Sequence, residues 1–327
     1  MENKGNILTK PLIVVLFAMF CCALWGSANP GIKIGYLHIL PGDMKTVPGM
    51  MLFAGMRFAL AGLITIIIYS IARRKFLYPK LSNVGRVLGV SAFQTVIQYI
   101  FFFIGVSNTS GVKSAIFSGS SAFFAVLISC LIFRLEKLTL KKILACLFGF
   151  AGIIIINLEG LNFNMTFTGD VFVLFSAVAS AISSVLMKMF SKHEDPVIIS
   201  GYQFFVCGLV MIVIGLCGGA SVKLDTPAAW GILLYLAVLS AVAYSLWSLL
   251  LKYNPVSKVT IYSFMIPIFG VFLSLLMLPD EKPASILCLI ITLVLVPLGI
   301  FLVNYNGSLI PSSLRNKFKK DEAEPEE

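Results

Sequence analysis

Residues 113–137 read KSAIFSGSSAFFAVLISCLIFRLEK, and residues 258–282 read KVTIYSFMIPIFGVFLSLLMLPDEK. Aligned without a gap, the two stretches are identical at nine of 25 positions. A common preference for apolar residues would explain shared leucines and isoleucines, but five of the nine matches are polar. They are Lys113, Ser118, Ser129, Glu136 and Lys137, which meet Lys258, Ser263, Ser274, Glu281 and Lys282. We therefore predict an internal repeat with an offset of 145 residues.

The residues around this repeat have the composition of a membrane protein. Of the 327 residues, 58% are hydrophobic and only 12% are charged, whereas soluble domains carry roughly 25% charged residues. A helix that crosses a bilayer needs about 20 apolar residues, and backbone inside lipid must satisfy its own hydrogen bonds. The predicted fold class is therefore an all-α polytopic membrane protein with ten transmembrane helices. They cover residues 12–37, 49–72, 86–107, 112–133, 140–157, 169–190, 196–217, 229–251, 256–278 and 284–305.

Each copy of the repeat contains five of these helices. Because five is odd, the second copy is predicted to be inverted in the membrane, and inverted repeats that meet at a midplane binding site are an architecture of transporters. We divide the chain into a first five-helix repeat (residues 1–160), a second inverted repeat (161–308) and a disordered cytoplasmic tail (309–327). An offset of 146 also places Gly55, Phe58, Gly62 and Leu63 on Gly201, Phe204, Gly208 and Leu209.

The positions of lysine and arginine predict the orientation of the chain. If the N-terminus is cytoplasmic, 19 of the 25 basic residues fall in inner loops and tails, three in outer loops and three within spans. Cytoplasmic loops are enriched in these residues, so both termini are predicted to be cytoplasmic in a multi-pass protein of the cell membrane. The net charge of +10 then reflects topology and contacts with the headgroups of the lipid bilayer. It does not predict a nucleic-acid partner.

Several short motifs, in order along the chain, resemble the EamA-type family of the drug/metabolite transporter superfamily, which has two homologous five-helix domains. The resemblance implies ten helices around a central cavity and the export or exchange of small metabolites, often amino acids. Members differ widely in substrate, so the resemblance does not name one. The motifs are Ala23-Leu24-Trp25-Gly26 with Lys33, Arg57-Phe58 with Ala61-Gly62-Leu63, Ser110–Ser121 with Glu136-Lys137-Leu138-Thr139, and Asn254-Pro255-Val256 with Asp280-Glu281-Lys282.

Polar and aromatic side chains near the middle of several spans are candidates for the wall of that cavity. Gln94 and Gln98 are four residues apart and share a helix face, and Ser118 and Ser263 are equivalent in the repeat. Each type has an alternative role, because amides also join helices, serines allow close helix packing, and Trp and Tyr also anchor spans at the membrane interface. The predicted substrate-binding residues are Trp25, Asn29, Gln94, Gln98, Tyr99, Ser118, Ser121, Tyr244, Trp247, Tyr262 and Ser263.

Five charged residues are assigned gating or structural roles. Lys33 and Lys113 lie near the outer ends of their spans, where long side chains can snorkel to the interface. Arg57 lies deeper, and we leave open whether it holds helices together or meets a substrate carboxylate. Glu136 and Glu281 are equivalent in the repeat and lie at helix exits on opposite sides. No Asp or Glu falls in the middle of a predicted span, which disfavours proton antiport through a buried carboxylate and capture of a cation by one.

These features predict a secondary transporter that works by alternating access and exports a small polar or amphipathic metabolite, such as an amino acid. A multidrug or toxic-cation efflux pump is the alternative within the same class. An intramembrane enzyme is the alternative from another class, but the only histidines, His38 and His193, fall in predicted loops and no catalytic motif accompanies them. The sequence has no ATP-binding motif, and we predict no cofactor and no metal site. The predicted partners are a small-molecule substrate and the bilayer, and a homodimer is left open.

Overall fold

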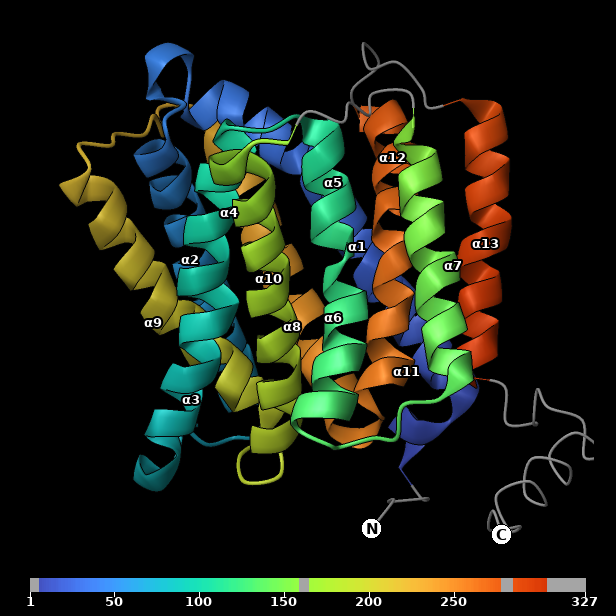
Figure 1. The fold of residues 1–327 in the computed structure, drawn as a ribbon. Helices are drawn as coiled ribbons and strands as arrows, with labels where there is room; N and C mark the ends of the chain where they lie inside the picture. The colour runs from blue at the N-terminus through green and yellow to red at the C-terminus, as the bar shows by residue number, and fades with distance from the viewer. Residues whose placement is uncertain (1–5, 159–164, 278–284, 305–327) are drawn as a thin grey trace, which may run out of the picture.

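The computed structural model describes residues 6–158, 165–277 and 285–304, and every regular element within these ranges is a helix (Figure 1). Nine helical stretches in these ranges are long and apolar enough to cross a membrane, so the chain is an all-helical, multi-pass protein. They are Pro11–Ile39, Val47–Ala72, Leu81–Ser107, Gly111–Ile132, Phe167–Phe190, Pro196–Cys217, Pro227–Tyr253, Val256–Met277 and Ile286–Asn304.

The segment predicted at residues 140–157 is also helical. It forms α7, Leu140–Ile156, which has 17 residues and is somewhat shorter than the roughly 20 residues of a typical span. The predicted tail, residues 309–327, lies outside the described residues.

Five of the nine stretches are single α-helices, and four are interrupted or preceded by a turn of different helical pitch. The single helices are α1 (Pro11–Ile39), α2 (Val47–Ala72), α9 (Pro196–Cys217), α10 (Pro227–Tyr253) and α13 (Ile286–Asn304). The others contain α3 (Val84–Ser91) with α4 (Gln98–Ser107), α5 (Gly111–Gly119) with α6 (Ser121–Leu127), α8 (Phe172–Phe190), and α11 (Val256–Thr260) with α12 (Ile266–Met277). Short 3-10 turns precede three of these helices, with Ile7–Thr9 before α1, Gly42–Met44 before α2 and Leu81–Asn83 before α3.

Local sequence explains where several helices begin. The hydroxyl of Thr46 accepts a hydrogen bond from the Gly49 amide at the start of α2, and that of Thr226 does the same at the start of α10. The Asp195 carboxylate caps α9 in this way. In all three helices a proline follows the cap, where its missing N–H costs no helical hydrogen bond.

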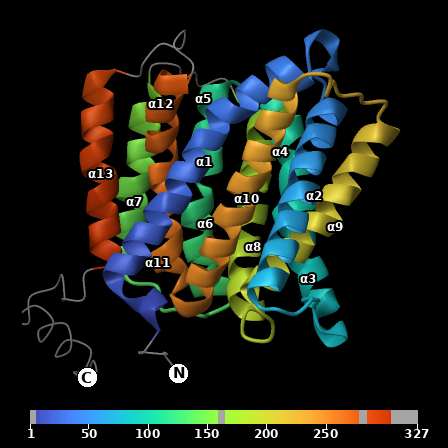
Figure 2. The same ribbon diagram turned by 180° about the vertical axis from the view of Figure 1, so that it is seen from behind.

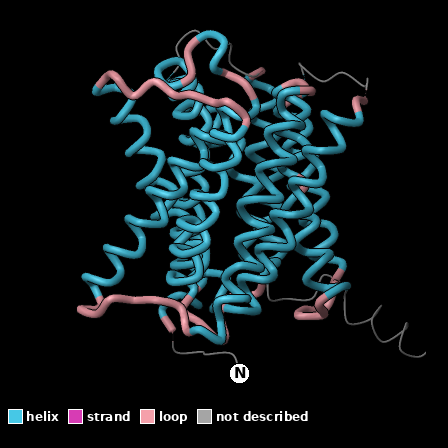
Figure 3. Tube along the Cα trace, turned by 90° about the vertical axis from the view of Figure 1, so that its left-hand side faces the viewer, coloured by secondary structure: helices cyan, strands magenta, loops and turns pink. Residues whose placement is uncertain are grey.

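The helices stand side by side with their ends at two levels (Figures 1 and 3). We call the level at which α1 begins and α13 ends the terminal end, and the level at which α1 ends and α2 begins the opposite end. The loop between α2 and α3 lies at the terminal end, whereas the loop between α9 and α10 lies at the opposite end (Figure 2). Helices α2 and α9 therefore run antiparallel to each other.

Helices α2 and α9 pack closely against each other through glycines. A Cβ atom added at Gly55 would lie 2.8 Å from the carbonyl oxygen of Gly208, and one added at Gly62 would lie 2.6 Å from that of Gly201. The two contacts are reciprocal. At the offset of 146, Gly55 corresponds to Gly201 and Gly62 corresponds to Gly208, so each contact is the repeat equivalent of the other. Between them Phe58 stacks on Phe204, its own counterpart, with ring centroids 5.1 Å apart.

A second reciprocal contact joins α7 to α13, which lie side by side in Figures 1 and 2. The Thr292 hydroxyl donates to the carbonyl oxygen of Gly152 over 3.0 Å. At the related position, a Cβ atom added at Gly299 would lie 2.7 Å from the carbonyl oxygen of Ala145. An offset of 147 exchanges these two pairs, so the last helix of each half packs on the other in a self-complementary way.

Replacing Gly62 with Ala should destabilise the protein. The added Cβ would meet the backbone nitrogen of Phe205 at 2.3 Å, and backbone cannot move aside cheaply, so we expect a loss of about 1–3 kcal/mol. Gly231→Ala is the matched control, because a Cβ there meets nothing within 4 Å. Thermal unfolding of the purified variants in detergent measures both. Equal melting temperatures for wild type and Gly62→Ala would contradict the packing.

Candidate functional site

Three helix irregularities lie in the same part of the bundle. A π-helical turn, Ala92–Ile97, separates α3 from α4 and carries Gln94. Helix α5 ends at Gly119 before α6 begins at Ser121, and a 3-10 turn, Ile261–Met265, separates α11 from α12. Pro267, which follows that turn, has no N–H to continue the helical bonding pattern. Such irregularities occur frequently at functional sites.

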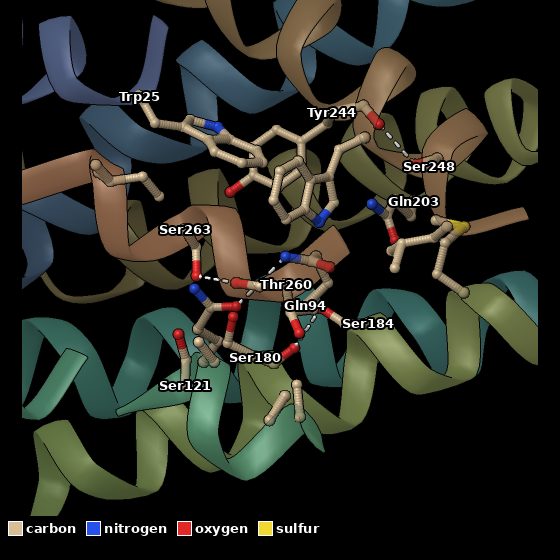
Figure 4. A pocket seen from close by; sticks show the side chains of 18 residues that line it. Trp25, Gln94, Ser121, Ser180, Ser184, Gln203, Tyr244, Ser248, Thr260 and Ser263 are labelled. Carbon is tan, nitrogen blue, oxygen red and sulfur yellow. Dashed lines mark hydrogen bonds between the residues drawn. The ribbon is translucent and has the colours of Figure 1, made fainter. Parts of the chain in front are cut away.

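These irregular segments border a cavity of about 200 Å³ (Figure 4). The cavity is displaced toward the terminal end, because its lining residues Met187, Leu251 and Thr260 lie close to the ends of their helices there. Its wall is made of apolar, aromatic and neutral polar side chains from both halves of the chain, and none of the described residues that line it is charged. They are Trp25, Gln94, Gln98, Ser121, Ala122, Ala125, Ser180, Ala181, Ser184, Met187, Gln203, Tyr244, Trp247, Ser248, Leu251, Thr260, Ser263 and Ile266.

One side of the cavity is aromatic. Trp25 of α1 meets Tyr244 and Trp247 of α10 edge to face, with centroid distances of 5.0 Å and 4.9 Å. Edge-to-face contacts are a favourable arrangement for such rings. They fix the Trp25 indole beside the cavity, where Figure 4 shows it next to Tyr244.

The other side is polar and its groups are largely preorganised. The Ser183 hydroxyl donates to Gln94 Oε1 over 2.7 Å, and Gln94 Nε2 donates to Gln98 Oε1 over 3.5 Å. The hydroxyls of Ser263 and Ser184 donate to carbonyl oxygens of their own helices. The amide of Gln94 is therefore held in one orientation toward the cavity (Figure 4).

Two lining residues have buried polar atoms without a partner. The side-chain nitrogen and oxygen of Gln203 make no hydrogen bond in the described chain, although the residue is fully buried. The indole nitrogen of Trp25 is likewise unpaired. Leaving a buried donor or acceptor unsatisfied costs about 1–3 kcal/mol. A polar ligand or water in the cavity would remove that cost.

The structure brings seven of the eleven predicted site residues to the cavity wall. They are Trp25, Gln94, Gln98, Ser121, Tyr244, Trp247 and Ser263.

The other four lie elsewhere. Asn29 is exposed, and its amide lies beside Gly270 of α12. Tyr99 packs against Phe58, and the fully buried Tyr262 accepts a hydrogen bond from Asn304. Ser118 has a buried hydroxyl without a partner, but it is not part of the wall.

Sequence reasoning missed several lining residues. Gln203 is an amide in the middle of an apolar run, which is the signal that identified Gln94, so it could have been found. Ser180 and Ser184 carry no such signal, because serines are common in tightly packed membrane helices. Only the facing of α8 toward α6 brings them to the cavity (Figure 4).

The predicted gating residues at the opposite end have different environments. Lys113 does not snorkel, because its Nζ lies 3.1 Å from Asp170 Oδ2 in a buried ion pair. Thr109 and the backbone amide of Thr166 also donate to this carboxylate. Asp170 is at the start of its span, so the pair fastens α5 to the beginning of the second half.

Of the remaining predicted charges at this end, Lys33 is exposed and Arg57 is buried. Glu281 lies outside the described residues.

Glu136 forms a polar cluster at the terminal end. Its carboxylate accepts hydrogen bonds from Lys142 Nζ at 2.8 Å, from the Ser257 amide at 3.2 Å and from the Ser257 hydroxyl. The cluster joins the loop after α6 to the start of α11. Burial of the carboxylate opposes its ionisation, but these donors outweigh burial and lower the pKa of Glu136 below its ordinary value.

Comparison with known proteins identifies the family. The EamA-like transporter family matches the chain twice, over residues 12–158 and 167–305. The chain belongs to this family. The resemblance seen in the motifs is thereby confirmed, and the family consists of transporters, which are not enzymes.

Individual relatives of this EamA-like protein are also named as transporters. YvbV of Bacillus subtilis is 23% identical over 88% of this chain and 90% of its own. The transporter sll0355 of Synechocystis is 23% identical over 94% of both chains. A solved crystal structure covers 94% of this chain and 98% of its own with a TM-score of 0.69 at 16% identity. At that identity, the likeness supports the fold alone.

The Glu136 cluster predicts a pH-dependent stability. A folded-state pKa below the ordinary value of 4.5 stabilises the protein above pH 4.5, and this contribution is lost as the pH falls through the lowered pKa. Glu136→Gln should therefore lose about 1.5–3 kcal/mol at pH 7, with a smaller difference from wild type in acid. Thermal unfolding at several pH values measures this, with Asp225→Asn as an exposed control. A difference that does not shrink in acid would contradict the assignment.

Proposed function

We propose that this EamA-like protein is a secondary transporter that exports a small polar or amphipathic metabolite, such as an amino acid, by alternating access. The observation that carries the proposal is the pair of unpaired polar groups, on Gln203 and Trp25, in a cavity walled by both halves of the chain. A substrate with its own donors and acceptors would pair with these groups, and its apolar part would lie against the aromatic side.

The size and charge of the cavity support a metabolite over a drug. Its volume of about 200 Å³ is below the roughly 300–1,000 Å³ of pockets that take drug-sized ligands. No carboxylate in the described part of the chain lines the wall, and capture of a hydrophobic cation usually depends on an acidic partner in the membrane. A multidrug or toxic-cation pump is the alternative in the same class.

An inverted two-fold architecture follows from the same proposal. With α7 as a further crossing, each half has five helices and the second half enters the membrane in the reverse sense. The reciprocal contacts of α2 with α9, and of α7 with α13, support this arrangement. Two inverted halves can exchange conformations, which is the basis of alternating access in such transporters.

The orientation we propose places the terminal end in the cytoplasm of the cell. Connections at this end contain Arg73, Arg74, Lys75 and Lys137. Those at the opposite end contain few basic residues, and cytoplasmic loops are the ones enriched in Lys and Arg. The cavity would then lie on the cytoplasmic side of the bilayer midplane.

Gln203→Leu and Gln98→Leu should each lower transport roughly tenfold, equivalent to about 1.4 kcal/mol. Each change removes a donor and an acceptor from the wall at nearly constant volume. Counterflow of radiolabelled amino acids in proteoliposomes, at matched protein amounts, is the measurement. Asn108→Leu is the control, because it also removes an amide but lies exposed at the opposite end. Normal transport by both variants, or better transport of tetraphenylphosphonium than of any amino acid, would refute the proposed site.

A further inference from the structure

Arg57 is a buried cation that no carboxylate among the described residues neutralises. Only 6% of its surface is exposed, and its Nε has no hydrogen-bond partner. Within the described ranges, no salt bridge reaches its guanidinium group, whose central carbon lies 4.3 Å from the centre of the Phe58 ring. A buried charge without an anionic partner is costly. An arginine with a purely structural role would be expected to hold a carboxylate or a backbone carbonyl.

A row of aromatic rings separates Arg57 from the cavity. Phe58 stacks on Phe204, and Phe204 meets Tyr244 with centroids 4.5 Å apart. Tyr244 in turn contacts Trp25 at the cavity wall. Arg57 itself is not part of that wall.

The surroundings of Arg57 are suited to an anion. Phe58, whose ring lies beside the guanidinium group, meets Tyr99 edge to face with centroids 4.8 Å apart, and its stacking partner Phe204 meets Tyr244. Phenolic O–H groups and a guanidinium group are all donors. A carboxylate matches the planar fork of arginine, which binds it through two parallel hydrogen bonds.

The repeat relates this position to the cavity. At the offset of 146, Arg57 corresponds to Gln203, and the residues after them are the stacked pair Phe58 and Phe204. Gln203 lies on the terminal side of this pair, seven residues into α9, and faces the present cavity. Arg57 lies nearer the opposite end. If the two halves exchange conformations, Arg57 takes the place in the newly opened cavity that Gln203 has in this one.

We propose that Arg57 binds the carboxylate of the substrate when the cavity opens at the opposite end. The proposal rests on the transport function proposed above and narrows its substrate class to small carboxylates, including zwitterionic amino acids. The two access states then differ in chemistry, because the cavity at the terminal end is neutral and its counterpart at the opposite end is cationic. A preference for a carboxylate over the matching amide is therefore expected at the opposite end and not at the terminal end.

The test compares carboxylates with their amides. Counterflow is measured in right-side-out and in inside-out membrane vesicles. The competitors are L-alanine, L-leucine, L-phenylalanine and the amide of each. At the membrane face that corresponds to the opposite end, the wild-type protein should prefer each amino acid over its amide at least tenfold. Arg57→Gln, which installs the side chain found at the equivalent position, should reduce that preference to within twofold, and Arg57→Lys should keep most of it. At the face of the terminal end, Arg57→Gln should change the ratio little.

The outcomes separate the two proposals. Transport without preference for the acid, or Arg57→Gln with the wild-type preference, would overturn the role of Arg57 and leave the transport function standing. A wild type that moves none of the compounds would overturn the transport function for this substrate class and the inference that rests on it. Folding of each variant is checked by size-exclusion chromatography and thermal unfolding. A uniform loss of rate for acid and amide alike would assign Arg57 a structural role and overturn the proposal.

Discussion

The close contact of α2 with α9 is the constraint on which the rest of the structure depends. Glycines at both ends of the contact let the two backbones touch, and any larger side chain at Gly62 would separate them. Because the contact is reciprocal, it also sets how the two halves face each other. Phe58 and Phe204 stack at its centre, with Arg57 and Gln203 directly before them in the chain. The geometry of one helix pair thus positions both the cavity and the buried cation.

The cavity is formed where several helices are interrupted by irregular turns. A π-helical turn displaces Gln94, and the breaks near Ser121 and Ser263 lie at related places in the two halves. A continuous helix satisfies its backbone polar groups with its own hydrogen bonds, whereas an interrupted helix leaves some of these groups to be satisfied by protein, water or a ligand. The polar clusters lie away from these breaks, with Lys113 and Asp170 at the opposite end and Glu136 at the terminal end.

Much of this organisation could be predicted from the sequence, and the limits have physical causes. Long apolar runs defined the membrane helices, and the residues Trp25, Gln94 and Tyr244 stood out because polar or aromatic groups are conspicuous in them. Periodicity does not fix how a helix is rotated when most of its surface is apolar. For this reason the sequence predicts Tyr262 at the cavity, whereas the structure buries it against Asn304, and no sequence pattern indicates the serines of α8. The pairing of Lys113 with Asp170 joins residues 57 positions apart, which no local pattern indicates.

The central claim is that the second half of this EamA-like transporter crosses the membrane in the reverse sense to the first. Sided cysteine labelling tests it directly, with Cys217 and Cys288 replaced by alanine. Asp43→Cys and His193→Cys probe the loop after the first helix of each half, and both positions are exposed. In intact cells, a membrane-impermeant maleimide should label position 43 and not position 193, and inside-out vesicles should give the reverse. Labelling of both positions from the same side would contradict the account.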